Sequence, residues 1–268
     1  MKKNNNNITL ILLLISVFAI LWIFYMQTPV SNETPSVQVT DTIELTAVDD
    51  SLIKSDSLDE AFQQQNTTDF TLPDTAFIDV PFVNQNPELP TGCEITSLTE
   101  VLNFYGFDID KESLARTYLP MMQELQSGAY IYYFYGSPWS SNGSGCFSPA
   151  IVNAANAFLS DVSSPLRAHK LSYSDVNTLL SEVAQGNPVI VWTSFDYSIK
   201  PVTYREVIIN DNEKFFWPTY EHCTVLTGYN LTDNTVTLTD PTYGIVVRSL
   251  EDFTYYYQMY FYQAVVIK

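Results

Sequence analysis

Basic residues are scarce in this sequence. Its 268 residues contain 12 Lys and Arg against 30 Asp and Glu, so the formal net charge is −18 and the isoelectric point is near 4.2. Proteins that bind DNA or RNA use clustered Lys and Arg to neutralise phosphates, and this sequence has no such stripe. We therefore expect no nucleic-acid partner. We interpret the negative charge as a solvated surface, with a preference for cationic substrates as the alternative.

Cysteine and histidine are also rare, with Cys93, Cys146, Cys223, His169 and His222 as the full set. This set is too small for a separate zinc site, and no acidic loop has calcium-ligand spacing, so we expect no metal and no cofactor. An odd number of cysteines does not form a disulfide framework and leaves at least one thiol unpaired within a monomer. A bridge between Cys146 and Cys223 stays open.

Charged residues are absent from residues 8–26, ITLILLLISVFAILWIFYM. This run is about long enough to cross a membrane as a helix. It ends in bulky residues, which favours an uncleaved signal anchor over a cleaved and secreted form. Lys2 and Lys3 precede the run, so the positive-inside rule places everything after Gln27 outside the cytoplasm. We expect residues 1–26 to be a cytoplasmic stub and transmembrane anchor at the cell membrane.

Residues 27–75 are rich in Ser, Thr, Asp, Glu and Gln and lack a sustained apolar period, which predicts a disordered acidic linker. As a random coil, such a linker would let a folded domain sample on the order of tens of ångströms from the membrane. The folded domain, residues 76–268, is expected to begin near Phe77, where FIDVPFV alternates apolar and polar residues as a strand does.

Helical patterns come first in this domain and strand patterns come late, which predicts an α+β fold with N-terminal helices packed against an antiparallel sheet. Gly and Pro positions and capping residues set the expected boundaries. The expected helices are 94–105, 110–118, 148–159, one capped by Ser174 that ends near Gly186, and 250–258; the expected strands are 188–193, 222–229, 235–240 and 260–267.

Cys93 directly follows Pro90-Thr91-Gly92 and directly precedes a helical pattern. Thr91 and Glu94 fit a capping box, which would place Cys93 in the first helical turn. There the helix dipole and the unpaired N–H groups stabilise a thiolate, so we expect a thiol pKa below the free value of about 8.5. The pattern predicts an activated nucleophile. The alternative is a buried structural cysteine that begins a helix.

A thiol nucleophile needs a base, and His222 opens a predicted strand about 130 residues after Cys93. His169 lies among basic residues and is interpreted as a surface histidine. The side-chain amide of Gln85 and the backbone N–H of Cys93 are candidate donors to an oxyanion.

The orienting group is expected on the next strand. Residues 222–229 and 235–240 flank the turn NLTDN and should form an antiparallel hairpin. If Tyr229 faces Thr235, Asp240 lies diagonally opposite His222 on the same face and can hold the imidazole tautomer. Cys223 then faces the opposite side as a core thiol.

The segments VPFVNQNPELPTGCEITSLTEVLNFYG, GSGCFSPAI, GNPVIVW, EHCTVLTGY and TLTDPTYG, in this order, resemble the bacteriocin-processing peptidase-like branch of papain-like cysteine peptidases. The resemblance covers roughly residues 77–268. It implies a papain-like fold, in which Gln85 is the oxyanion-hole glutamine, Cys93 the nucleophile, His222 the general base and Asp240 the orienting acid. No transporter or Walker A segment is present, so the double-glycine specificity of the exporter-linked members is not carried over.

Together these features predict a monomeric, membrane-anchored extracytoplasmic cysteine peptidase that cuts peptide or protein substrates through a thioester. An acyltransferase or a peptidoglycan amide hydrolase stays open. So does a catalytically silent binding module, in which the tyrosine-rich runs 130–135 and 255–257 would line a ligand groove rather than a core. Cys146 has no assigned role beyond a structural or cleft-lining thiol.

Overall fold

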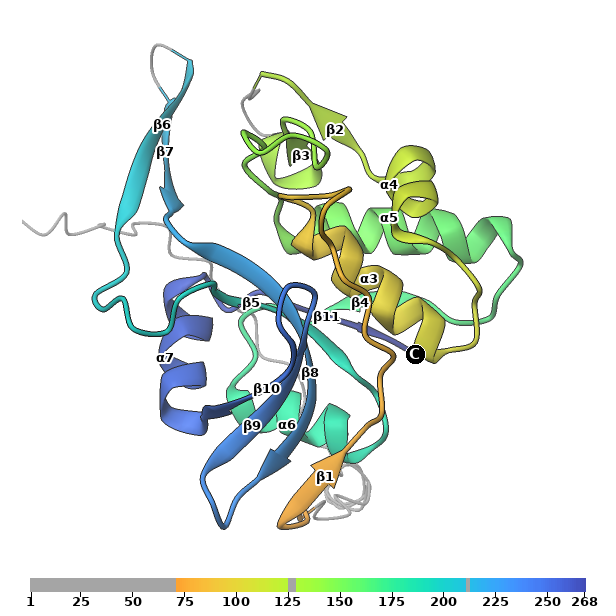
Figure 1. The fold of residues 1–268 in the computed structure, drawn as a ribbon, viewed down its shortest axis with the longest axis vertical. Helices are drawn as coiled ribbons and strands as arrows, with labels where there is room; N and C mark the ends of the chain where they lie inside the picture. The colour runs from red at the N-terminus through yellow and green to blue at the C-terminus, as the bar shows by residue number, and fades with distance from the viewer. Residues whose placement is uncertain (1–70, 125–128, 211–212) are drawn as a thin grey trace, which may run out of the picture. The chain divides into compact units, whose positions relative to one another are not determined.

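The computed structural model describes residues 71–124, 129–210 and 213–268 (Figure 1). The expected anchor and nearly all of the expected linker lie outside these residues, so both stay predictions. No helix within the described ranges is long and apolar enough to cross a membrane. Thr67–Lys268 form one compact unit, and the fold below belongs to it.

A seven-stranded antiparallel sheet forms the centre of the domain. Its strand order is β10-β9-β8-β5-β11-β4, and β1 pairs with β8 off this path. The strands are β1 Thr75–Phe77, β4 Ala168–Lys170, β5 Val189–Ser194, β8 Glu221–Asn230, β9 Thr235–Asp240, β10 Gly244–Ser249 and β11 Ala264–Ile267.

Helices cover both faces of this sheet. Their bounds are α3 Cys93–Phe104, α4 Lys111–Tyr118, α5 Ser148–Asp161, α6 Val176–Ala184 and α7 Leu250–Met259, with a short 3₁₀ helix, η1, at Tyr130–Tyr132. Ile190 and Trp192 of β5 pack into a core with α3, α4 and α5, whereas Val189 and Val191 pack into a second core with α6. Because strand side chains alternate between faces, β5 separates the two cores. The predicted α+β arrangement of N-terminal helices against an antiparallel sheet is confirmed.

Two small sheets lie outside the main one. β6 Tyr204–Asn210 and β7 Glu213–Pro218 form an antiparallel hairpin that extends away from the main sheet in Figure 1. β2 Met121–Met122 and β3 Phe134–Tyr135 pair in parallel. The sequence patterns did not predict either pair.

Three expected boundaries are wrong for local reasons. The strand expected across FIDVPFV ends at Phe77. Helix α6 is capped by Asp175, which accepts a hydrogen bond from the Thr178 N–H at 2.8 Å, rather than by Ser174. The last strand begins at Ala264 rather than at residue 260, because α7 runs to Met259 and a turn with two left-handed residues separates the two elements.

Candidate active site

Helix α3 begins at Cys93, as the sequence predicts, but the capping box is wrong. The N-cap is Gly92, and no side chain caps the helix. The Thr91 hydroxyl donates instead to the carbonyl oxygen of Ser140 at 2.9 Å, and the Glu94 carboxylate accepts from the backbone N–H of Cys146 at 2.6 Å. Both side chains thus join the start of α3 to residues 140–146 by hydrogen bonds.

Gly92 is required by close packing at this point. A Cβ added there would lie 2.8 Å from Leu89 Cβ, inside the contact distance of two carbon atoms. Because the residue before Cys93 has no side chain, the chain can turn tightly into α3. Cys93 therefore keeps its place in the first helical turn without the predicted threonine cap.

Acidic groups surround the Cys93 thiol, which is partly exposed. Its Sγ lies 3.4 Å from Glu94 Oε2 and donates to it. Burial raises the pKa of the thiol, and the charges of Glu94 and Glu221 raise it further, while the backbone of Cys223 on β8 lowers it. The predicted lowering of the Cys93 pKa is therefore wrong, because burial of the thiol and then the charges of Glu94 and Glu221 oppose the helix terminus.

His222 and Asp240 are joined by a buried hydrogen bond. His222 Nε2 lies 3.0 Å from Asp240 Oδ1, with His222 3% and Asp240 4% exposed. The same oxygen accepts from the backbone N–H groups of Thr242 and Tyr243 at 2.8 and 3.1 Å. Burial raises the pKa of the Asp240 carboxyl, but His222 and the two amides outweigh it, so that pKa is lowered. The carboxylate can hold the imidazole with Nδ1 free for proton exchange.

A β-bulge brings this pair into register. Near the turn the predicted register is wrong by one residue, since Tyr229 faces Val236 rather than Thr235. The register shifts between Leu226 and Gly228, and beyond it Val225 faces Thr239, which is the predicted register. One extra residue in β8 therefore puts His222 and Asp240 on one face, as expected.

Gln85 lies in the loop before α3 and is buried, with 5% exposure. Its backbone N–H donates to the carbonyl oxygen of Pro241 at 2.8 Å, which joins this loop to the residue after Asp240. Its side-chain Nε2 donates to the carbonyl oxygen of Pro90 at 3.1 Å, while Oε1 is buried with no hydrogen-bond partner among the described residues. The amide thus lies in the loop that leads into Cys93, with one N–H of its NH₂ group engaged.

Two acidic residues of the site were missed by the sequence interpretation. Glu221 directly precedes His222, as Glu94 directly follows Cys93. Burial, and then the charge of Glu94, raise the pKa of Glu221, whose Oε2 accepts from Trp217 Nε1 at 2.7 Å. A Cβ on Gly145 would lie 2.7 Å from Glu94 Oε1 and 3.7 Å from Glu221 Oε2, so both carboxyl groups converge on this glycine. The sequence did carry a signal for both residues, because Glu94 is adjacent to Cys93 and Glu221 is adjacent to His222.

The other cysteines and His169 lie where the sequence predicts. Cys146 and Cys223 are fully buried free thiols, so no bridge joins them. Trp192 Nε1 donates to the carbonyl oxygen of Cys146 at 2.8 Å, which makes that segment a structural support of the site. His169 is exposed on β4. Within the described ranges, no group of three or more His, Cys, Asp or Glu side chains is arranged to hold a metal ion.

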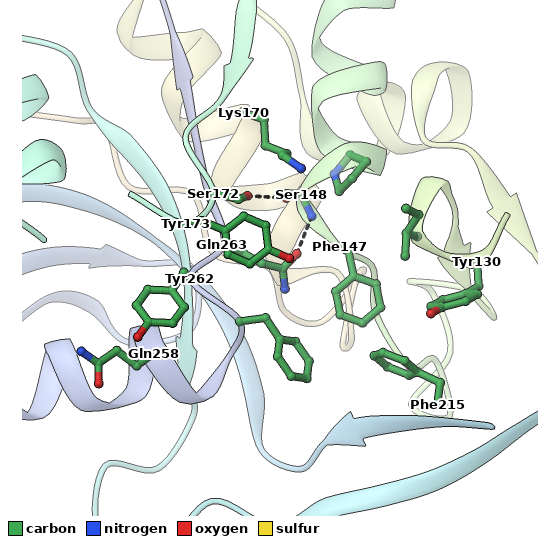
Figure 2. A pocket seen from close by; sticks show the side chains of 13 residues that line it. Tyr130, Phe147, Ser148, Lys170, Ser172, Tyr173, Phe215, Gln258, Tyr262 and Gln263 are labelled. Atoms are coloured by element: carbon green, nitrogen blue, oxygen red, sulfur yellow. Dashed lines mark hydrogen bonds between the residues drawn. The ribbon is translucent and has the colours of Figure 1, made fainter. Parts of the chain in front are cut away.

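An aromatic cavity of about 480 Å³ includes Phe147, which directly follows Cys146 in the chain (Figure 2). Tyr130, Phe147 and Phe215 form its apolar wall, and Ser148 donates its backbone N–H to Gln263 Oε1 at 2.8 Å on the polar side. Phe147 also contacts Trp217, with ring centroids 4.8 Å apart, which connects the cavity to Glu221.

The two tyrosine-rich runs have divided roles. Tyr130 of the first run lines the aromatic cavity, but Phe134 of that run is fully buried in the core. Tyr256 and Tyr257 of the second run are fully buried in the two cores. Of these runs, Tyr130 and Ile131 line the aromatic cavity.

Comparison with known proteins places the chain in a family. The profile of the Peptidase_C39 like family matches residues 77–265, more than half of the chain. The chain belongs to the peptidase C39-like family. The uncharacterized protein YvpB of Bacillus subtilis is 30% identical over 179 residues, which cover 65% of this chain and 68% of YvpB. A candidate C39-like peptidase from Bacillus anthracis is 26% identical and covers 72% of this chain and 97% of its own, with a TM-score of 0.62.

The family assignment confirms the resemblance inferred from the motifs. The C39-like family is a family of cysteine peptidases with a papain-like fold, and the α+β fold described above agrees with it. Gln85, Cys93, His222 and Asp240 all lie within the matched residues.

Proposed function

We propose that this protein is a cysteine peptidase that hydrolyses a peptide or amide bond through Cys93, His222 and Asp240. The observation that carries the proposal is the buried hydrogen bond between His222 and Asp240. It lies on strands next to the start of α3, and Ser97 of α3 donates to the carbonyl oxygen of Cys223, the residue after His222, at 3.2 Å. A nucleophile, a base and an orienting acid thus come from adjoining elements.

In the first half-reaction His222 removes the proton of the Cys93 thiol as Sγ attacks the substrate carbonyl carbon. Because Nε2 is hydrogen-bonded to Asp240, Nδ1 is the nitrogen that takes this proton. A C–S bond forms, and the carbonyl oxygen becomes an oxyanion. When the oxyanion collapses, the C–N bond breaks, and His222 returns the proton to the leaving amine. A thioester on Cys93 remains.

In the second half-reaction water attacks the thioester while His222 accepts a proton from it. The C–S bond breaks, the carboxylic acid product leaves, and the Cys93 thiol regains its proton. The Cys93 backbone N–H and the second N–H of the Gln85 amide are proposed to donate to the oxyanion in both steps. An amine in place of water would make the same chemistry an acyl transfer.

The proposal includes a location. The uncharged run 8–26 supports a single-pass anchor with the peptidase domain outside the cytoplasm. Substrates near the outer membrane surface would then be within reach of the domain. Carbonate extraction of membranes and protease access to intact cells test this. Release of the domain from membranes by cleavage near Gln27 would contradict an anchored role.

A second candidate function is a binding module of the same fold without turnover. The observation that favours it is the hydrogen bond from Cys93 Sγ to Glu94, together with the raised pKa of the thiol. A thiol that stays protonated and points at a carboxylate is a poor nucleophile unless a base removes its proton. The silent module and the peptidase therefore differ in whether Cys93 can be acylated.

Acyl-enzyme formation separates these candidates. The full-length protein is mixed with p-nitrophenyl acetate, a simple acyl donor, quenched in acid and analysed by intact mass and peptide mapping. The peptidase proposal predicts one acetyl group on Cys93 in the wild type and none on Cys93→Ala. A mixture of unrelated peptides, digested by both proteins and analysed by mass spectrometry, then tests for cleavage. Absence of Cys93 acylation together with absence of cleavage would leave the binding module.

A further inference from the structure

A pocket of about 630 Å³ lies beside the His222–Asp240 pair, distinct from the aromatic cavity of Figure 2. It is lined by Phe195, Asp196, Tyr197, Ser198, Tyr243, Val246 and Arg248. Nothing in the mechanism above uses these side chains. Phe195 and Tyr243 are 42% and 52% exposed, so a ligand can reach the aromatic rim.

This pocket adjoins the base directly. The Phe195 ring packs edge-on against the His222 imidazole, with ring centroids 5.3 Å apart, and also lies 5.3 Å from the Tyr243 ring. Tyr243 donates its backbone N–H to Asp240. In the proposed reaction His222 gives its proton to the leaving amine, so the leaving portion of the substrate passes the imidazole. The pocket thus adjoins the residue that would protonate the leaving amine.

Arg248 places a positive charge in this pocket and forms no contact ion pair in the described part of the chain, although its charge, after the hydrogen bonds from Ser198, helps to lower the pKa of Asp196. Its Nε is buried and has no hydrogen-bond acceptor among the described residues. The guanidinium carbon lies 4.7 Å from the centre of the Tyr197 ring, which fixes the side chain by a cation–π contact and leaves the N–H groups unused. By contrast, Lys111 and Lys200 form ion pairs of 2.7 and 2.5 Å with Glu88 and Asp252. Arg248 therefore has N–H donors to offer a ligand.

Asp196, the acid in the same pocket, makes its hydrogen bonds to Ser198 and acts on Arg248 only through its charge. Its Oδ1 accepts from the backbone N–H and the hydroxyl of Ser198 at 2.8 and 2.7 Å. No ion pair joins Asp196 to Arg248 in the described part of the chain. The five N–H donors of an arginine match the two oxygens of a carboxylate, so the ligand chemistry that fits this guanidinium is a carboxylate.

We propose that Arg248 is a specificity-determining residue that binds a carboxylate in the leaving portion of the substrate. The carboxylate belongs either to an acidic side chain or to the free C-terminus of the peptide. The position of this portion relative to the scissile bond rests on the proposed peptidase function; the carboxylate site itself does not. Phe195 and Tyr243 would contact the apolar part of the substrate residue that carries this carboxylate, next to the His222 imidazole.

Binding can be tested without turnover. The sequence has four arginines, so the side-chain Nε–H signals of a ¹⁵N-arginine-labelled full-length Cys93→Ala protein can be assigned with Arg248→Gln as the reference. Three probes are titrated: acetyl-Ala-Glu-amide, acetyl-Ala-Gln-amide and acetyl-Ala-Ala with a free C-terminus. The proposal predicts a saturable shift of the Arg248 signal with at least one carboxylate probe and none with the glutamine probe. The probe that binds identifies the source of the carboxylate.

Two further variants serve as controls for the binding experiment. Arg205 lies 3.4 Å from the Ser144 hydroxyl in a different pocket, so Arg205→Gln should leave probe binding unchanged. Asp196→Asn removes the competing negative charge and should tighten carboxylate binding. Absence of a saturable Arg248 shift with both carboxylate probes would overturn the proposal, as would equal shifts with the glutamine probe.

Cleavage gives the second readout. For a cleaved peptide with Glu in its leaving portion, Arg248→Gln should lower kcat/KM by about tenfold, equivalent to about 1.4 kcal/mol, and should leave the Gln counterpart unchanged. An equal loss for both peptides would indicate a structural role and contradict the proposal. If Cys93 proves unreactive while the Arg248 signal shifts, the peptidase function fails and the carboxylate site stands.

Discussion

The two halves of the candidate site differ in how far they are prepared for reaction. On the β8–β9 half, His222 and Asp240 are buried and hydrogen-bonded, and the Asp240 carboxylate is stabilised as an anion. On the α3 half, the Cys93 thiol faces Glu94 and has a raised pKa. The proposed base thus already has its orienting partner, while the thiol of the proposed nucleophile donates to a carboxylate.

This difference indicates when activation occurs. A standing thiolate would need a positive environment, and Glu94 and Glu221 provide the opposite. We therefore expect proton transfer from Cys93 to His222 to accompany attack on the substrate rather than precede it. A resting thiol is also slow to react with oxidants, because thiolates are the species that oxidise.

Replacement of His222, the proposed base, should have the largest effect on the reactivity of Cys93. We expect His222→Ala to lower the rate of Cys93 acetylation by p-nitrophenyl acetate by about 10²–10⁴-fold, the range for loss of a general base. His169→Ala is the matched control, since His169 is exposed on β4, and it should leave the rate unchanged. An equal rate in His222→Ala and wild type would show that β8 supplies no base.

Asp240→Asn tests the orienting half of the site. Asparagine Oδ1 can still accept from the Thr242 and Tyr243 N–H groups and from His222 Nε2–H, but the neutral amide lacks the negative charge of the carboxylate. The imidazolium that forms when His222 takes the Cys93 proton is then less stable, and we expect an acetylation rate lower by about tenfold or more. Circular dichroism and the melting temperature check the fold. A rate near that of wild type would reduce Asp240 to a structural role.

Glu94→Gln tests the α3 half of the site, where the carboxylate lies beside the Cys93 thiol. The variant removes a negative charge beside the thiol, so the pKa of Cys93 falls and its thiolate fraction rises. We expect iodoacetamide labelling of Cys93 at pH 7 to rise by about three- to tenfold, since each pKa unit changes the thiolate fraction about tenfold well below the pKa. Glutamine Oε1 can still accept from Cys146 N–H. Slower labelling would show that Glu94 serves as a base for the thiol.

The smallest expected effect is on stability. Burial raises the pKa values of Glu94, Glu221 and Glu100 above 4.5. The folded state then binds protons more tightly than the unfolded state, so the free energy of unfolding falls as pH rises from about 4.5 through the raised values.

The melting temperature should therefore be higher near pH 5 than near pH 8, and the difference should shrink in Glu100→Gln. A change of about 1 kcal/mol moves Tm by about 2–4 °C in a domain of this size, which calorimetry resolves. Arg116 pairs with Glu112 on the surface of α4, so Glu112→Gln is a matched control with no expected change in the pH dependence. A Tm that rises from pH 5 to pH 8 would contradict the account.

The sequence correctly predicted those features of the fold and the site that depend on residues close together along the chain. The start of α3, the β8–β9 hairpin and the joint face of His222 and Asp240 follow from helix and strand periodicity. The hairpin register is wrong at the turn and right at the site, because a bulge near Thr227 adds one residue to β8. Strand periodicity alone cannot locate a bulge, since it carries no signal for an unpaired residue.

Contacts between segments distant in the sequence explain the features that were predicted wrongly. Thr91 does not cap α3 because its hydroxyl bonds the loop at Ser140, 49 positions later. Glu94 and Glu221 meet at Gly145, and three segments distant in sequence must fold before this contact exists. The pKa of Cys93 is raised by burial first and by these carboxyl groups second, so the helix terminus alone predicted the wrong direction.

The pH dependence of Cys93 modification tests the central claim most directly. Iodoacetamide labelling and p-nitrophenyl acetate acylation are measured from pH 5 to 9 on the full-length wild type and on His222→Ala. The account predicts that labelling is slow at neutral pH, whereas acylation already rises well below the range in which the thiol ionises, and that His222→Ala loses this rise. Acylation that follows the thiolate alone, equally in both proteins, would contradict a catalytic pair of Cys93 and His222.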